Sequence, residues 1–187
     1  MRRLIVSAIG LILFSATVNA GQYRIGISGS YFHPSEKAFR NIYGTGIIFG
    51  LDVSRHIWKD MELHLEVRYY SKKGQLTFTR ERTRIKLIPL IVSTRYTFLK
   101  RKINLYAGGG LTLNFFRENN PIGRVKESKL GFAVKIGALK RIKGFKKIIK
   151  IFIIDAYINY HYCKMKPAEI KFDAGGIDFG IALGTEF

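Results

Sequence analysis

The sequence predicts an all-β protein, an eight-stranded antiparallel transmembrane β-barrel with short turns at one end and longer loops at the other. Three observations predict this fold. The final segment of the chain alternates apolar with small or polar residues, earlier segments repeat the same alternation, and no later apolar run is long enough to cross a bilayer as a helix.

Residues 176–187 illustrate the alternation. Ile177, Phe179 and Ile181 share one parity with the terminal Phe187, so in a strand their side chains project to one face. The intervening residues are small or charged and project to the other face. A strand that is apolar on one side and polar on the other is typical of a membrane barrel, where lipid contacts one face and the lumen the other.

Eight segments of the chain show this period of two. In chain order they cover residues 22–32, 44–54, 61–70, 75–98, 103–116, 130–139, 149–162 and 176–187. Each is at least as long as the roughly 9–11 residues that a tilted spanning strand needs. In the third segment Met61, Leu63 and Leu65 oppose Glu62 and His64, two sets that a helical period of 3.6 residues would mix.

Two segments are irregular. The fourth contains Pro89, which cannot donate to a strand ladder, so we expect a bulge or a change of face near it. The first half of the seventh segment, from residue 149, is apolar on both faces, so its orientation is less well defined.

The connections between segments differ in length. Residues 55–60, 99–102 and 140–147 form the short ones. Residues 33–41, 71–83, 117–128 and 164–173 form the mostly longer ones. An even number of strands returns the chain to its starting side, so the short turns and both termini are expected at the same end.

The start of the chain has the layout of a secretory signal peptide. Arg2 and Arg3 precede an apolar stretch over residues 4–14, and small residues at 18–20 precede Gly21. We therefore predict a signal peptide at residues 1–20 and a barrel domain at residues 21–187. An N-terminal core helix or an uncleaved anchor is the alternative.

Composition excludes several classes of function. The chain has 187 residues and a single cysteine, Cys163, so no disulfide within the chain stabilises it. The sequence contains no CxxC pair, metal-ligand spacing, nucleophile elbow or phosphate-binding loop. The length leaves room for one domain, and nothing in the sequence indicates a cofactor.

Together, the signal segment, the eight alternating strands and the terminal Phe187 resemble the small eight-stranded outer-membrane proteins of bacteria. This family includes outer-membrane proteins X and W and the opacity-type surface antigens. The resemblance implies a bacterial outer-membrane location, periplasmic termini, and recognition of Phe187 by the barrel assembly machinery. It also implies a non-enzymatic role in envelope integrity or surface interaction.

The inward positions carry many charged and polar residues, which form a predicted interior network. Its members are Arg24, Asp52, Glu62, His64, Glu66, Arg68, Arg95, Lys135, Asp155, His161 and Asp178. A secreted soluble barrel that binds an apolar ligand is the rival fold, but so many inward charges do not suit an apolar cavity. We interpret the network as paired charges that fill the lumen and fix the strand register.

Two other functions are compatible with the sequence. His64 and His161 lie near inward carboxylates by register, an arrangement compatible with proton transfer or hydrolysis. An outer-membrane enzyme that modifies lipid A needs a serine beside a histidine, and the candidates near His161 are the loop residues Ser35, Ser71 and Ser128. A small-solute channel is the other alternative.

The strong positive charge, +19 at pH 7, suggests anionic partners. Arg82, Arg84 and Lys86 continue the outward parity of the fourth segment, so we expect them to contact lipopolysaccharide phosphates just above the hydrocarbon. Basic residues at 100–102 and 140–147 are expected to form a second rim suited to anionic phospholipid headgroups. Nucleic acid is not an expected partner, because the basic residues fall in two separate belts.

Overall fold

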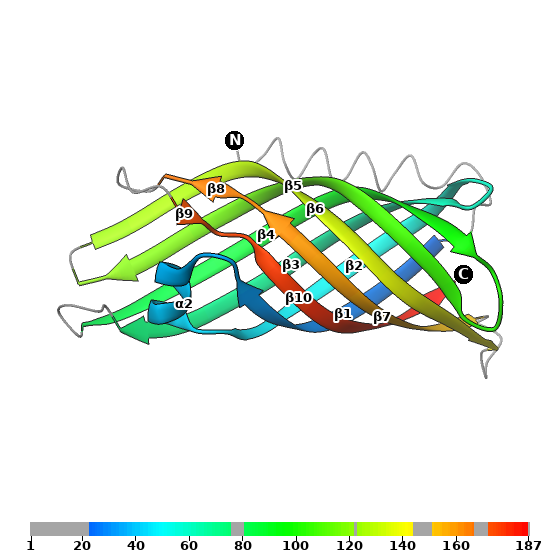
Figure 1. Ribbon diagram of the computed structural model, residues 1–187, viewed down its shortest axis with the longest axis horizontal. Helices are drawn as coiled ribbons and strands as arrows, with labels where there is room; N and C mark the ends of the chain where they lie inside the picture. Colours follow the sequence, from blue (N-terminus) through cyan, green and yellow to red (C-terminus); the bar gives the residue numbers. More distant parts are fainter. Residues whose placement is uncertain (1–22, 76–80, 122, 144–150, 167–171, 187) are drawn as a thin grey trace.

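The protein is described by a computed structural model over residues 23–75, 81–121, 123–143, 151–166 and 172–186. Eight antiparallel strands form a closed barrel in the order β1-β10-β7-β6-β5-β4-β3-β2 (Figure 1). They are β1 (Tyr23–Pro34), β2 (Gly46–Trp58), β3 (Met61–Gln75), β4 (Arg82–Leu99), β5 (Asn104–Asn120), β6 (Gly123–Lys143), β7 (Ile151–Tyr162) and β10 (Gly176–Glu186). The predicted fold class is confirmed. Within these ranges, no helix is long and apolar enough to cross a membrane.

The barrel closes where the first strand pairs with the last. Arg24 of β1 lies opposite Glu186 of β10, so β1 begins at the end of the barrel where β10 finishes. We call this the terminal end and the opposite one the distal end. The signal peptide predicted at residues 1–20 and the terminal Phe187 lie outside the described residues.

The two faces of the barrel wall differ in polarity. Large apolar side chains point outward, among them Leu51, Leu111 and Ile181, and each is more than half exposed. Their neighbours along the strands are buried in the lumen, as in β7, where buried and exposed residues alternate along most of the strand. A wall that is apolar outside and polar inside has the polarity that a bilayer requires.

The prediction of a bulge or a change of face near Pro89 is wrong. Val67 pairs with Leu90 and Tyr70 pairs with Leu87, so the register between β3 and β4 is the same on both sides of the proline. Pro89 points into the lumen and lies opposite Asn114 of β5. The proline removes one donor from the ladder without adding a residue, and a strand shifts register only when a residue is inserted.

The irregularities lie instead at the terminal end. The register shifts between His56 and Trp58 on β2, and between Thr97 and Leu99 on β4. Lys59, in the turn after β2, has a positive φ of 35°. These shifts occur where the strands end in tight turns, a usual place for bulges in a barrel.

The strands extend further toward the distal end than the alternation predicts. Much of the expected loops at 71–83 and 117–128 is strand: Lys73 pairs with Arg84, and Arg117 pairs with Lys126. Outward residues in these extensions are cationic and polar instead of apolar. The apolar pattern that marks a membrane-spanning strand therefore stops before the hydrogen-bonded ladder does.

An unpredicted cap covers the distal mouth of the barrel. It consists of α2 (Lys37–Tyr43) and the short pair β8 (Lys164–Met165) and β9 (Phe172–Asp173) (Figure 1). The cap packs on inward side chains of the distal strands in one apolar cluster. Its buried members are Phe32, Phe39, Tyr43, Ile48, Tyr70, Ile85, Leu87, Phe116, Cys163, Met165 and Ala174.

Aromatic and polar contacts hold the cap together and join it to the barrel. The Phe39 and Phe172 rings stack with centroids 6.1 Å apart, which joins α2 to β9. The Tyr43 hydroxyl forms a 3.0 Å hydrogen bond with the Thr83 hydroxyl of β4. Burial raises the pKa of Tyr43, so its hydroxyl stays protonated near neutral pH and can donate a hydrogen bond.

Candidate functional site: the charged lumen and the distal basic face

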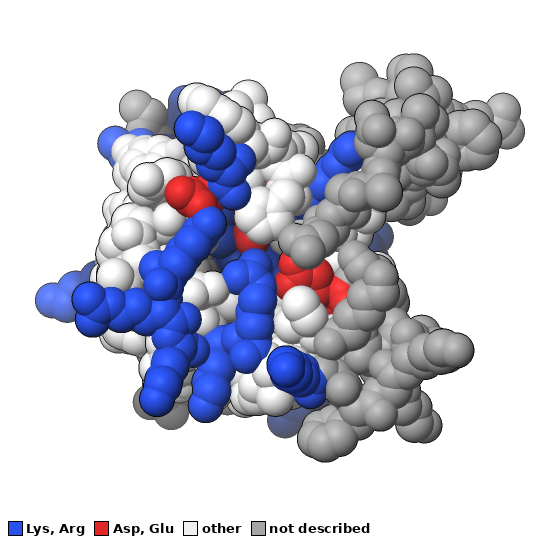
Figure 2. Space-filling view, turned by 90° about the vertical axis from the view of Figure 1, so that its right-hand side faces the viewer, with Lys and Arg blue, Asp and Glu red and all other residues white. Residues whose placement is uncertain are grey.

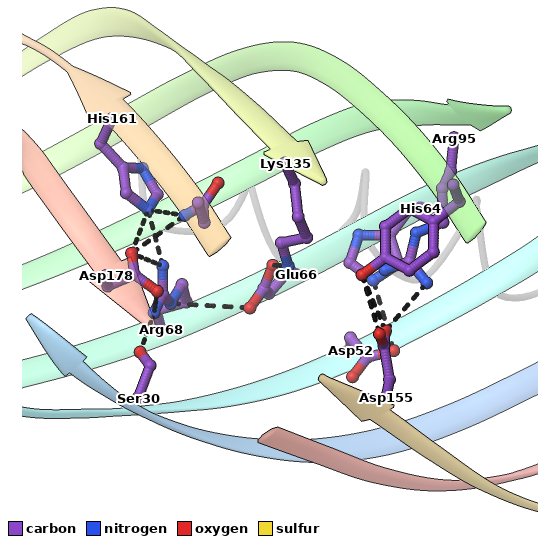
Figure 3. Close-up of polar contacts among 12 residues, drawn as sticks. Ser30, Asp52, His64, Glu66, Arg68, Arg95, Lys135, Asp155, His161 and Asp178 are labelled. Carbon is purple, nitrogen blue, oxygen red and sulfur yellow. Dashed lines mark hydrogen bonds and ion pairs between the residues drawn. The ribbon is translucent and has the colours of Figure 1, made fainter. Parts of the chain in front are cut away.

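Arg68 of β3 is the centre of the distal half of the lumen (Figure 3). Its two terminal nitrogens donate to both carboxylate oxygens of Asp178 on β10, at 2.9 and 2.8 Å. It also donates to the Ser30 hydroxyl of β1 and lies 2.6 Å from the His161 Nε2 atom of β7. One fully buried guanidinium therefore joins four strands across the lumen, and the paired geometry with Asp178 is the strong bidentate form.

His161 and Asn159 complete this cluster on β7. Asn159 donates from Nδ2 to Asp178 at 3.0 Å, and the His161 Nε2 atom lies 3.2 Å from the same carboxylate. The polar partners of that histidine nitrogen are thus Arg68, Asn159 and Asp178. In the described part of the chain, none of the serines considered for catalysis forms a hydrogen bond with His161.

Glu66 and Lys135 form the middle of the lumen. The Lys135 ammonium of β6 donates to the Glu66 carboxylate of β3 at 2.6 Å. The same ammonium lies 4.5 Å from the centre of the Tyr157 ring. Glu66 also lies 3.5 Å from the Arg68 Nε atom, so the middle pair is continuous with the distal cluster.

Near the terminal end the lumen contains two further sets of contacts. The Tyr106 hydroxyl lies 2.9 Å from both oxygens of Asp155, and Arg95 pairs with the same carboxylate at 3.3 Å. On the other side, His64 pairs with Asp52 at 3.3 Å. Arg24 lies 3.5 Å from Glu62 and 4.0 Å from Asp52. All eleven residues of the predicted interior network therefore lie inside the barrel, although they form several clusters along the lumen instead of one site.

Arg141 is a lumenal residue outside the predicted interior network. It donates to Glu186 at 3.0 Å and lies 3.4 Å from Glu62 at the terminal mouth. The predicted sixth segment ends at residue 139, which places Arg141 in a turn, whereas β6 continues to Lys143. The period of two could have identified it, because Arg141 continues the inward series of Lys135 and Leu139.

Outside the barrel, a cationic surface covers the distal ends of β3 to β6. We call it the distal basic face. Its members are Lys73, Arg82, Arg84, Lys86, Arg117, Arg124 and Lys126. The ladder places Lys86 opposite Arg117, and Arg117 opposite Lys126, so the cations lie side by side across adjacent strands.

This face includes all three residues predicted to contact lipopolysaccharide. Arg82 and Arg84 are exposed and Lys86 is half-buried, while Thr83 and Ile85 between them are buried in the lumen. The nearest strand acids, Glu118 and Glu127, have the opposite parity to the cations on their strands. Among the described strand residues, no carboxylate shares the outward parity of the face, so its positive charge is not neutralised within it.

Apolar outward residues begin directly below the distal basic face. Ile88 lies two residues after Lys86, on the same outward side of β4. It pairs across the ladder with Phe115, which points to the same side of β5 as Arg117. A step of two residues along a strand covers roughly 7 Å. The cations therefore lie immediately beyond the apolar band, where the charged headgroups of a membrane would begin.

No family model matches the chain, and no curated protein matches it in sequence. Several solved structures match it in fold. The outer-membrane protein OprG from Pseudomonas aeruginosa has a TM-score of 0.69 and 13% identity over 90% of this chain and 96% of that one.

The matches to two further structures cover nearly all of those chains. Neisserial surface protein A has a TM-score of 0.65 and 14% identity over 90% of this chain and 98% of that one. The attachment invasion locus protein Ail of Yersinia pestis, solved with the heparin analogue sucrose octasulfate, has a TM-score of 0.57 and 15% identity over 89% and 99%. Likeness at this level of identity establishes fold alone, and the chain has the fold of the small eight-stranded outer-membrane β-barrels.

Proposed function

We propose that this protein is a non-enzymatic barrel of the bacterial outer membrane, exported by a signal peptide at residues 1–20 and inserted by the barrel assembly machinery, which reads Phe187. Its role is in envelope integrity or surface interaction, with the distal end facing out. In this role the distal basic face binds the phosphate groups of lipopolysaccharide.

The observation that carries the proposal is the distal basic face itself. Its cations are adjacent across four strands and lie directly above an apolar band. Guanidinium groups match phosphate oxygens in a bidentate geometry, and a row of them suits an array of phosphates. The similar barrel Ail was solved with a sulfated sugar, so there is precedent for a polyanion bound to a protein of this fold.

The lumen gives little support to the two alternative functions. A lipid A-modifying enzyme needs a nucleophile and a base at the lipid surface, whereas His161 is buried and bonded to Arg68 and Asp178. A small-solute channel needs a continuous polar path. Here ion pairs cross the lumen, and an apolar cluster closes its distal end.

The test replaces the three predicted lipid-binding cations with glutamine, in Arg82→Gln/Arg84→Gln/Lys86→Gln. Lipopolysaccharide retained by the purified protein is expected to fall at least about tenfold at low salt, since each of the three exposed ion contacts contributes about 0.5–1 kcal/mol. In the intact protein, high salt should release the same lipid, because exposed ion pairs are screened.

The matched control removes three cations from the other end, in Lys59→Gln/Arg101→Gln/Lys102→Gln, and should retain the lipid. Equal lipopolysaccharide on the distal variant and the intact protein, at low and at high salt, would contradict the proposed contact.

A further inference from the structure

Two turns lie side by side at the terminal end of the barrel. The first follows β2 and contains Lys59 and Asp60, and the second follows β4 and begins at Lys100. The Asp60 carbonyl accepts a 2.9 Å hydrogen bond from the Thr97 amide, and the Asp60 carboxylate forms an ion pair with Lys100. These contacts bring the cations of both turns onto one part of the rim.

The rim carries an excess of exposed positive charge, visible as blue lysine and arginine side chains over much of the described part of this end (Figure 2). We call the exposed cations the terminal basic rim. They are Lys59, Lys100, Arg101, Lys102, Lys140 and Lys143.

The described acids near the rim neutralise little of this charge. Asp60 pairs with Lys100, and no described carboxylate forms an ion pair with the neighbouring turn residues Arg101 and Lys102. Glu62 and Glu186 are buried inside the mouth and are bonded to Arg141. Among the described residues, the charge on the outside of the rim is therefore almost entirely positive.

Large apolar side chains adjoin these cations on the outer wall. Trp58 is 67% exposed and precedes Lys59, while Phe98 is 57% exposed and lies just before the Lys100 turn. Ile103, which follows Lys102, is also exposed. Exposed aromatic residues followed by lysines and arginines are the arrangement found where a membrane protein crosses from hydrocarbon into the headgroup layer.

We propose that the terminal basic rim selects anionic phospholipids from the membrane leaflet around it, by binding their phosphodiester headgroups. The apolar neighbours favour a lipid over a soluble anion, because they hold acyl chains directly beneath the cations. Clustered lysines and arginines at a membrane surface attract anionic lipids in this way. The proposal rests on the membrane location proposed above and does not depend on the lipopolysaccharide contact.

Trp58 is a native reporter for this rim. It is the single tryptophan of the chain, and its ring lies 5.8 Å from the Lys59 ammonium. Bromine atoms on acyl chains quench tryptophan fluorescence only at short range. Brominated lipids therefore report which lipids surround this rim and are not affected by lipids at the distal end.

The experiment reconstitutes the full mature chain in vesicles of phosphatidylglycerol and phosphatidylcholine, with the bromine on one lipid or on the other. At low salt, the apparent enrichment of phosphatidylglycerol around Trp58 is expected to be about fivefold over the bulk mixture. High salt should reduce it toward the bulk value. Both leaflets have the same composition, so the direction of insertion does not affect the result.

Variants assign the enrichment to the rim. Arg101→Gln/Lys102→Gln should lose most of it and keeps Trp58 and Lys59 in place. Asp60→Asn/Lys100→Gln should lose little, because it removes a neutral pair and leaves the net charge of the rim unchanged. Arg82→Gln/Arg84→Gln removes the same charge from the distal end and should leave the enrichment unchanged.

Three results would overturn the proposal. They are equal quenching by both brominated lipids in the intact protein, full enrichment in Arg101→Gln/Lys102→Gln, and an equal loss in the distal variant, which would indicate an effect of net charge alone. Absence of quenching by either lipid would overturn the membrane location as well, so failure of the two proposals is distinguishable.

Discussion

At the scale of single residues, buried charges in the lumen are stable only because each has a partner. Arg68 is fully buried. Its two terminal nitrogens bond to Asp178, Ser30 and His161, and its Nε atom lies 3.5 Å from the Glu66 carboxylate. An ion pair transferred from water recovers its desolvation cost only with good geometry and additional hydrogen bonds. The bidentate contact with Asp178 meets this condition, so Arg68 is a critical cross-link between strands.

Removing only the arginine of the Arg68–Asp178 pair should destabilise the barrel severely. In Arg68→Leu the Asp178 carboxylate stays buried without its main partner, so we expect the free energy of unfolding to fall by about 3–5 kcal/mol. The measurement is urea unfolding of the protein folded in detergent or vesicles.

Two variants check that the loss comes from the unpaired carboxylate. Arg68→Leu/Asp178→Leu should recover most of the lost stability, because an apolar pair of similar size carries no buried charge. Lys100→Gln removes a cation from the exposed pair with Asp60 and should change stability by less than about 1 kcal/mol. A single Arg68→Leu variant as stable as Lys100→Gln would contradict the role assigned to Arg68.

The sequence predicts the direction of lumenal side chains well and their partners poorly. Parity within a strand is sufficient to place Glu66 and Lys135 inward, since alternate residues point to opposite faces. Their contact depends on the register between strands far apart in the barrel, which one sequence does not specify. Arg141 was missed for a simpler reason, because the predicted strand ended two residues before it.

At the scale of strands and turns, close approach between neighbouring strands decides where glycine is required. A Cβ atom at Gly110 of β5 would lie 2.0 Å from the Val92 carbonyl oxygen and 2.4 Å from the Ser93 Cα atom of β4. At Gly29 of β1 a Cβ atom would meet nothing within 4 Å. The two glycines are therefore a matched pair for testing interstrand packing.

Gly110→Ala is expected to destabilise the barrel by about 1–3 kcal/mol, because backbone atoms of β4 must move to make room. In Gly29→Ala the added methyl group points outward into free space, so the change should be neutral or stabilise the strand by up to about 1 kcal/mol. Urea unfolding of the two variants measures the difference. Equal stability of both would show that β4 and β5 adapt without cost.

Distal elements were the hardest to predict, because their polarity pattern is the reverse of that in the membrane-spanning part. Beyond Ile88 the outward positions of β4 are cationic, whereas Ile85 and Leu87 point into the apolar cluster under the cap. A search for apolar outward residues therefore ends the strands too early. The spacing of Phe39 and Tyr43, four residues apart, was the available signal for α2.

At the scale of the whole molecule, the barrel has a closed wall, a lumen filled with ion pairs, an apolar distal seal and a basic surface at each end. Alternation, strand number and turn length predicted the closed wall, because all three follow from local sequence and the geometry of closure. The distal seal depends on contacts among β1, α2, β9 and several other strands, and local periodicity carries no information about these contacts.

The end of the chain provides a test of assembly that is separate from stability. The resemblance assigns Phe187 to recognition by the assembly machinery, so deleting it, or replacing it with a charged residue, should lower the amount of protein in the outer membrane. The stability of protein already folded in detergent should change much less. Normal membrane levels of the truncated chain in cells would contradict this assignment.

The closed wall also predicts behaviour on a gel. Because β1 pairs with β10, every strand of the barrel has two hydrogen-bonded neighbours and no free edge from which unfolding can begin. Unheated samples in detergent should therefore keep the barrel and migrate differently from boiled samples, in which the chain is unfolded. Identical migration before and after boiling, together with a helical circular-dichroism spectrum, would contradict the barrel. If the spectrum is β-rich and Arg68→Leu lowers the temperature at which heating changes the migration, then the heat resistance of the barrel depends on the ion pairs in its lumen.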